Sequence, residues 1–242
     1  MPSRRDPKGR MTMLKCRWEL CPLRRNGILA EDNSQQLDDY RHQIYPSFYA
    51  KRQIIFHEGN PCMGIHVLCS GTAKLTQTDR FGRIHLLKIV KPGEIIGDIA
   101  AYDHPAYAIT AETVEDCTIC FLPKAALLEF LTRYSDVALR IISLLSQELR
   151  NSQEKMRDFA LKDAEGRLAT FLTKLGADYG EQSKDGVRFR LPLSRGELAE
   201  AIGVAPETVI RLLGKLSEKR ILRVRGRHCV ISDPVRLQKI AD

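Results

Sequence analysis

Seven basic side chains lie close together near the C-terminus of this 242-residue chain. Between positions 211 and 227 there is only one acidic residue, Glu218, so the local net charge is 7 − 1 = +6, and the whole chain carries +8. Guanidinium and ammonium groups at this density attract polyanions such as nucleic acids; a solvated basic surface is the alternative. The seven residues are Arg211, Lys215, Lys219, Arg220, Arg223, Arg225 and Arg227.

The residues at the start of this basic stretch have side chains that can recognise bases. Arg211 can donate two hydrogen bonds to O6 and N7 of guanine, and Glu207 can accept one from N4 of cytosine. Ile210 can contact the methyl group of thymine, and Thr208 can bond to several bases. Glu207 and Arg211 are also one helical turn apart, a spacing at which a simple surface ion pair forms. The pattern therefore indicates base reading if a helix presents these side chains to a groove.

Two short helices joined by a tight turn are predicted to present them, within residues 194–220. Ser194 and Glu197 form a capping-box pattern at the start of the first helix, and Gly203 is placed to end it. Each helix has an inner apolar face, formed by Leu198, Ala199 and Ile202 in the first and by Val209, Leu212, Leu213 and Leu216 in the second. This is the pattern of a helix-turn-helix, whose second helix enters the major groove of DNA.

Basic residues around this motif are predicted to contact phosphates. Residues 221–233 alternate between apolar and polar as a small hairpin around Gly226. The hairpin arginines, together with Arg195, are candidates for contacts that position the motif without reading sequence.

The rest of the chain predicts a β-rich part followed by a long helix. Short β-rich runs over residues 53–123 indicate a β-barrel or roll, with glycines at its turns: Gly59, Gly71, Gly82, Gly93 and Gly97. From about Asp136 to Phe159, apolar residues recur every three or four positions, and no Gly or Pro interrupts them. A helix of this length fits pairing with a copy of itself, or the core of a monomer. A second helix is expected over about 163–177, followed by a polar turn.

This order of elements, and the segment PETVIRLLGKLSEKRIL at 206–222, resemble the CRP/FNR superfamily of bacterial transcription regulators. The resemblance covers the chain from about Tyr40 onward and includes the motifs GIHVLCSGTAKL and VKPGEIIGD. It implies an α+β fold with a tail at 1–39, a cyclic-nucleotide-binding-type sensory β-roll at 40–134, a dimerisation helix at 135–161 and a winged helix-turn-helix at 162–242. It also implies a homodimer on a palindromic operator, with RNA polymerase as a further partner.

By the same resemblance, Glu207 and Arg211 are the base readers. Pro206 and Ile210 replace residues that are more usually polar, which leaves the operator sequence open. The predicted DNA-binding set is Arg195, Pro206, Glu207, Thr208, Ile210, Arg211 and Lys215.

Cyclic nucleotide is the first candidate for the signal, and the sequence argues against it. In family members that bind it, a Gly-Glu motif precedes an Arg-Ser-Ala segment whose arginine neutralises the cyclic phosphate. The corresponding stretch here is GDIAAYDHPAYAIT, with Pro105 where the arginine is expected. A buried phosphate without that cation binds poorly.

An oxygen- or redox-labile iron–sulfur cluster, as in the FNR branch, is the second candidate. That branch has a group of N-terminal cysteines and one cysteine on a later strand, and thiolates are the ligands that such clusters need. Cys120 falls at the strand position, but only Cys16 and Cys21 stand where three cysteines are expected. The fourth ligand would be Cys62, a non-cysteine group, or absent. The candidate metal ligands are therefore Cys16, Cys21, Cys62 and Cys120.

The remaining cysteines and the histidines leave other signals open. Cys117 and Cys120 are three residues apart, so on a strand they point to opposite faces. Cys69 and Cys229 are expected in the core. Three further signals stay open: a thiol switch between Cys16 or Cys21 and another cysteine, an apolar effector, and a haem. The haem would be held by a histidine such as His57, His66 or His85.

Other function classes have little support. We find no phosphate loop, nucleophile elbow or paired zinc motif, and we therefore expect no enzyme. No apolar run approaches the roughly 18 residues of a membrane span, and no signal-like segment opens the chain, so a cytoplasmic protein without a membrane role is expected. The alternative function is a cyclic-nucleotide-binding module that regulates another protein without touching DNA.

Overall fold

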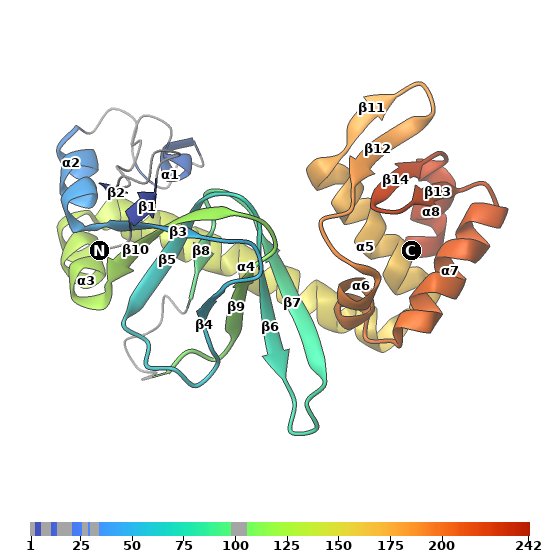
Figure 1. The fold of residues 1–242 in the computed structure, drawn as a ribbon, viewed down its shortest axis with the longest axis horizontal. Helices are drawn as coiled ribbons and strands as arrows, with labels where there is room; N and C mark the ends of the chain where they lie inside the picture. The colour runs from blue at the N-terminus through green and yellow to red at the C-terminus, as the bar shows by residue number, and fades with distance from the viewer. Residues whose placement is uncertain (1–2, 6–10, 14–20, 26–28, 30–33, 98–105) are drawn as a thin grey trace. The chain divides into compact units, whose positions relative to one another are not determined.

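The structure is a computed structural model that describes residues 3–5, 11–13, 21–25, 29, 34–97 and 106–242 (Figure 1). The chain forms two compact units, residues 1–147 and residues 148–242. Within the described ranges, no helix is both long and apolar enough to cross a membrane.

The N-terminal unit is built on two four-stranded antiparallel sheets, which confirms the predicted β-roll. The first sheet has the order β3-β10-β5-β8 and the second β4-β9-β6-β7. Their strands are β3 (Tyr45–Tyr49), β4 (Ile54–Phe56), β5 (Gly64–Ser70), β6 (Ala73–Thr78), β7 (Ile84–Val90), β8 (Ile95–Ile96), β9 (Thr110–Thr113) and β10 (Cys117–Pro123). Two further short strands, β1 (Ser3–Arg5) and β2 (Met11–Met13), pair with each other.

Gly71 shows why the predicted turns need glycine. It lies between β5 and β6 with a φ of +89°, a conformation that other residues rarely adopt. A Cβ atom at this position would lie 2.4 Å from the carbonyl oxygen of Asp116. Both the backbone angle and the neighbouring strand end therefore require a residue without a side chain.

Two hydrophobic clusters cover opposite faces of the first sheet. One cluster is formed by residues of both sheets, among them Phe56, Leu68, Leu75, Val90, Ile96 and Ile119. The other joins the first sheet to helices α2 (Ser34–Gln43), α3 (Lys124–Arg133) and the start of α4, through Tyr40, Ile65, Val67, Leu122, Phe130, Val137 and Ile141. Strands β5 and β10 are thus buried on both faces.

A short helix, α1 (Pro22–Arg25), precedes α2. Helix α2 runs across residue 39, where the predicted tail ends. The predicted domain boundaries therefore stay proposals.

Helix α4 (Ser135–Leu161) is the predicted long helix, with 27 residues. Val137 and Ile141 pack against the roll. Other apolar side chains of α4 remain exposed, with exposed fractions of 67% for Leu139, 58% for Ile142, 44% for Leu145, 59% for Leu149 and 64% for Met156. These five residues, at three-, four- and seven-residue intervals, form what we call the α4 stripe.

The C-terminal unit combines helices with a four-stranded antiparallel sheet of order β11-β12-β14-β13. Asp163 caps the helix that begins at Ala164 by accepting a hydrogen bond from the backbone N–H of Gly166 at 2.8 Å. The elements are α5 (Ala164–Tyr179), β11 (Glu181–Ser183), β12 (Gly186–Arg190), α6 (Arg195–Ile202), α7 (Pro206–Glu218), β13 (Leu222–Arg225), β14 (His228–Ile231) and α8 (Pro234–Ala241). This is the predicted winged helix-turn-helix.

Candidate nucleic-acid interface

Helix α6 begins and ends as its sequence predicts. The backbone N–H of Glu197 donates to Ser194 Oγ at 3.2 Å, and the backbone N–H of Ser194 donates to Glu197 Oε2 at 2.7 Å. These two bonds complete the capping box and satisfy N–H groups that a helix leaves without partners at its start. Gly203 ends the helix in the left-handed conformation, with φ +67° and ψ +48°.

The turn after α6 also packs against the end of α4. A Cβ atom at Gly203 would lie 2.9 Å from Cε1 of Phe159. Arg167 of α5 stacks its guanidinium 5.2 Å from the centre of the Phe159 ring and donates from Nε to the carbonyl oxygen of Ile202 at 2.9 Å. A close ring contact, a stacked cation and a hydrogen bond therefore fix the turn of the motif to α4 and α5.

Helix α7 has one buried and one exposed side. Val209, Leu212, Leu213 and Leu216 are buried, as predicted. The exposed side carries Pro206, Glu207, Ile210, Arg211 and Lys215, while Thr208 is half-buried. The Ile210 side chain is 59% exposed, which leaves its apolar surface available for contact. Among the described residues, no ion pair joins Glu207 to Arg211, so both side chains are available on the exposed side of α7.

Lys215 has a partner that the sequence did not suggest. Its Nζ forms an ion pair with Glu165 of α5, and Lys219 Nζ lies 3.2 Å from the same carboxylate. Hydrogen bonds from Lys215 and then from Lys219 hold the pKa of Glu165 below its ordinary value. The two lysines are 50 and 54 residues from Glu165 in sequence, so no local pattern could have revealed the cluster.

Arg195 links α6 to the hairpin formed by β13 and β14. Its Nη2 donates to the carbonyl oxygen of Gly226 at 2.9 Å, and Gly226 forms the predicted hairpin turn with a φ of +57°. The guanidinium therefore lies at the tip of the wing, beside Arg225 and Arg227.

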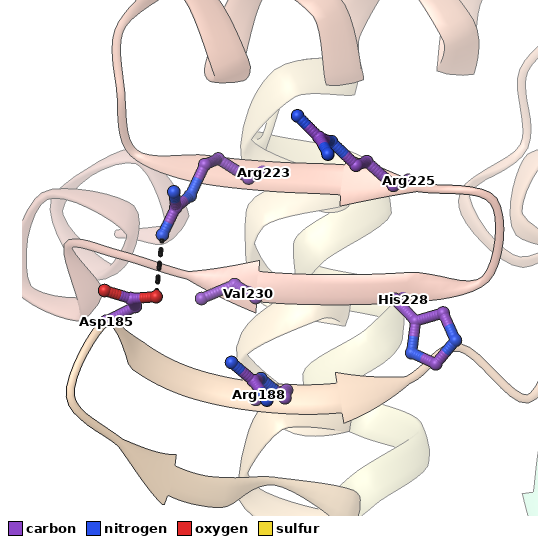
Figure 2. Close-up of a pocket in the computed structure, with 6 residues that line it drawn as sticks. All are labelled: Asp185, Arg188, Arg223, Arg225, His228 and Val230. Atoms are coloured by element: carbon purple, nitrogen blue, oxygen red, sulfur yellow. Dashed lines mark ion pairs between the residues drawn. The ribbon is translucent and has the colours of Figure 1, made fainter.

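The outer face of the winged sheet is basic. Strands β12, β13 and β14 alternate, so that Phe189, Leu222, Cys229 and Ile231 are buried on the inner face. On the outer face an open pocket of about 390 Å³ is lined by Asp185, Arg188, Arg223, Arg225, His228 and Val230 (Figure 2). One acid offsets this charge, since Asp185 lies 3.3 Å from Arg223. Sequence reasoning found the hairpin arginines but missed Arg188, which the strand pairing adds to the same face.

The four candidate metal ligands are only partly brought together. Cys16 lies outside the described residues, and Cys62 belongs to the cluster between the two sheets. Cys21 and Cys120 belong to the other cluster, against the helices. Among the residues that the structure describes, no three His, Cys, Asp or Glu side chains form a group that could hold a metal ion. Cys62 therefore lies apart from Cys21 and Cys120, and the four-ligand set stays a prediction because Cys16 is outside the described residues.

The remaining cysteines lie on different faces and in different units. Cys117 and Cys120 face opposite clusters, as their spacing predicts. Burial raises the pKa of Cys117 to about 11 and that of Cys229 to about 12, which keeps both as inert thiols. Cys69 is only half-buried and lies beside Cys120, an arrangement that sequence reasoning missed.

Among the candidate haem ligands, His66 is packed in the core of the roll. It is 8% exposed, and its ring lies 4.9 Å from that of Phe121 and 5.3 Å from that of Phe56. Burial lowers the pKa of His66 to about 4, so the ring is neutral at physiological pH. His57 is exposed and His85 is half-buried on β7. Pro105, which replaces the expected cyclic-phosphate arginine, lies outside the described residues.

Comparisons with known proteins agree with this architecture. An anaerobic regulatory protein of Pasteurella multocida is 29% identical over 215 residues, which cover 88% of this chain and 77% of that protein. A CRP-like cAMP-activated global transcriptional regulator of Mycobacterium tuberculosis is 25% identical over 219 residues, covering 90% and 98%. The solved structure of FixK2 from Bradyrhizobium japonicum is similar in fold, with a TM-score of 0.73 and 24% identity over 82% of this chain and 98% of that one.

Family models match both units. Residues 46–134 match the cyclic nucleotide-binding domain, and residues 166–240 match the Crp-like helix-turn-helix domain. The chain belongs to the CRP/FNR superfamily. As a CRP/FNR regulator it is a DNA-binding transcription regulator, and α6 and α7 are its helix-turn-helix.

Proposed function

We propose that this CRP/FNR regulator binds a palindromic operator as a homodimer, with α7 of each protomer in a major groove. The observation that carries the proposal is the exposed side of α7, where Glu207, Ile210 and Arg211 stand clear of the core. Two such helices related by a two-fold axis reach half-sites about one helical turn apart.

The side chains in the first turns of α7 have specific roles in this proposal. Arg211 donates to O6 and N7 of a guanine, and Glu207 accepts from N4 of a cytosine. Ile210 contacts a thymine methyl group, and Thr208 bonds to a base edge or a phosphate. Pro206 occupies the first helical position, where its missing N–H has no partner to lose, and so starts the reading helix without strain.

Basic groups around α7 contact phosphates in this proposal. Arg195 lies at the wing tip through its bond to Gly226, and Lys215 lies on the exposed side of α7. The outer face of the sheet extends the positive surface beyond the wing (Figure 2). Such contacts fix the register of the protein on the duplex and make its affinity depend on salt.

The α4 stripe supports the homodimer. Its five side chains are each at least 44% exposed, and they lie on a different side of α4 from Val137 and Ile141, which pack on the roll. Apolar residues that recur at three- and four-residue intervals along a long helix are typical of helix pairing. A second copy of the same helix has the matching surface.

For the signal, we propose a redox or oxygen signal that is received by cysteines of the roll, in preference to cyclic nucleotide. Pro105 in place of the phosphate-binding arginine supports this choice. Relatives of the chain differ in this respect, since one is named for anaerobic regulation and another for activation by cAMP. Anaerobic purification followed by absorbance and iron analysis tests the cluster and haem forms of the signal: colourless, iron-free protein with full operator affinity would exclude both.

The proposed setting is the cytoplasm, with RNA polymerase as the partner that responds to the regulator's position on DNA. The signal changes how the roll packs on α4, and the two reading helices move into or out of register with successive major grooves.

Replacement of Arg211 tests the reading role. Operators are first selected from a random duplex pool with the wild-type protein, and affinity is then measured for Arg211→Ala and for Arg80→Ala, a matched control in an exposed turn of the roll. Arg211→Ala is expected to weaken operator binding about 5- to 150-fold and to relax the preference at one base pair, because a bidentate pair contributes about 1–3 kcal/mol. Arg80→Ala is expected to bind as the wild type.

The alternative function, a cyclic-nucleotide module that acts on a protein partner, makes the opposite prediction. Under it, no operator is enriched from the pool, and Arg211→Ala behaves as the control does. Circular dichroism of each variant shows whether the fold is retained.

A further inference from the structure

Two cysteines of the roll lie sulfur to sulfur. The thiol of Cys69 on β5 donates to Sγ of Cys120 on β10, with 3.2 Å between the sulfur atoms. The two residues are 51 positions apart in sequence, and neither the helix-turn-helix nor the α4 stripe accounts for the pair.

A bulge in the first sheet sets this position. Strands β5 and β10 are antiparallel, and Cys120 lies opposite Val67. The register then shifts, because Ile119 pairs with Leu68 while Thr118 pairs with Ser70, which makes Cys69 the extra residue of β5. Diagonal neighbours in a regular sheet lie about 7–8 Å apart, whereas a bulge re-aims the side chain of its extra residue.

Both sulfur atoms face the cluster between the first sheet and helices α2, α3 and α4. Cys120 is fully buried there, at 0% exposure. Cys69 is half-buried, one residue before the end of β5. Cys69 is therefore the more exposed residue of the pair, and it is the one that a small polar reagent would meet first.

The pair fits dithiol chemistry better than metal binding. A structural zinc ion takes four ligands. Among the described residues, no third His, Cys, Asp or Glu joins these two thiols in a group that could hold a metal ion. Two thiols at 3.2 Å need to approach by only about 1 Å to reach the S–S bond length of a disulfide.

We propose that Cys69 and Cys120 form a reversible disulfide when the protein meets hydrogen peroxide or an organic hydroperoxide. The Cys69 thiolate attacks the O–O bond, which gives a sulfenic acid on Cys69 and releases water, or the alcohol from an organic hydroperoxide. Cys120 Sγ then attacks the sulfenic sulfur and forms the S–S bond. The S–O bond breaks, and the hydroxide leaves with the thiol proton of Cys120 as a molecule of water. Two thiols lose two electrons and two protons, and one peroxide is reduced. The inference rests on the proposed redox role of the roll and not on the DNA-reading role.

Mass spectrometry of the full-length protein tests the pair. Reduced protein is treated with one equivalent of hydrogen peroxide, alkylated under denaturing conditions and digested. The expected result is the loss of two alkylatable thiols and a cross-linked peptide pair that contains Cys69 and Cys120, both reversed by dithiothreitol. Cys69→Ser is expected to abolish the cross-link. Cys117→Ser, which lies on the same strand as Cys120 but faces the other cluster, is expected to retain it.

Three results would overturn the proposal. One is Cys69 oxidised to the sulfinic acid while Cys120 remains alkylatable. Another is a cross-link that joins either residue to Cys16 or to any other cysteine. The third is a metal ion in the purified protein that is released with these two thiols. Operator affinity of the reduced protein is measured in parallel. Reduced protein that binds no operator, but still forms the cross-link on oxidation, would count against the proposed function alone.

Discussion

A single histidine inside the roll shows how surroundings decide the charge of a residue. His66 lies among the rings of Phe56, Phe121 and Tyr107, and its Nδ1 finds no hydrogen-bond partner in the described residues. A charged imidazolium would lose its hydration there without compensation. The fold therefore accepts His66 only as a neutral ring.

The stability of the protein is expected to depend on pH through His66. Burial lowers its pKa to about 4, whereas an unfolded chain holds the ordinary value of about 6.5. The unfolded state therefore binds the proton more tightly, so stability is full above pH 6.5 and falls by about 3 kcal/mol as the pH drops toward 4. His66→Phe is expected to remove this part of the fall, because it keeps an aromatic ring and loses the titrating group. Denaturant unfolding of both proteins at pH 4–8 measures the difference, and a gap between them that does not change with pH would refute the assignment.

Residue-scale prediction from sequence succeeded where the signal is local. Ser194, Glu197 and Gly203 act within one helix, so their spacing alone predicts the cap and the end of α6. Glu165 and Lys215, like Cys69 and Cys120, meet only through the folded chain. A single sequence carries no signal for such pairs. The sequence therefore predicted Cys69 as an ordinary core residue, and it suggested Cys62 as the cysteine that would join Cys120 as a cluster ligand.

At the scale of elements, the turn between α6 and α7 is held by contact as well as by its own conformation. Gly203 has a positive φ and lies against the Phe159 ring at the end of α4. A side chain there would strain the backbone and press on the ring. The end of α4 and the entry to the reading helix therefore move together.

Gly203→Ala is expected to destabilise the C-terminal unit by about 1–3 kcal/mol, because alanine disfavours the left-handed conformation and its Cβ would lie 2.9 Å from Phe159. Gly214→Ala is the matched control. It lies inside α7, where a Cβ atom would meet nothing within 4 Å, and alanine favours a helix interior by roughly 0.5–1 kcal/mol. Thermal and denaturant unfolding should therefore shift in opposite directions for the two variants. A Gly203→Ala variant that is as stable as the wild type would show that neither the backbone angle nor the Phe159 contact constrains the turn.

The elements that the sequence missed have weak or atypical patterns. Helix α2 has only two apolar side chains, Leu37 and Tyr40, among polar ones, so its periodicity is faint. Strand β3 contains Pro46, which argues against a strand, although an edge position tolerates it. Helix α3 follows β10 without a loop, and β11 lies in a stretch whose composition is typical of a polar turn. The long helix, the helix-turn-helix and the glycine-punctuated strands have strong periods and were predicted correctly.

At the scale of the whole molecule, the α4 stripe is expected to decide the oligomeric state. Leu149→Glu places a charge in the proposed helix pairing, where it has no partner, and is expected to weaken the dimer more than about 100-fold. Operator affinity should fall with it, because one protomer reaches only one half-site. Analytical ultracentrifugation measures the dimer constant. Ser143→Glu, exposed but outside the stripe, serves as the control, and equal dimer constants for the two variants would contradict the proposed interface.

The carboxylate of Glu165 competes with DNA phosphates for Lys215 and Lys219. A phosphate must displace that carboxylate before Lys215 or Lys219 can turn to the duplex. Any duplex, random or specific, therefore gains less from these two ammonium groups than their charge suggests. Discrimination between sites then depends on the side chains that face the bases.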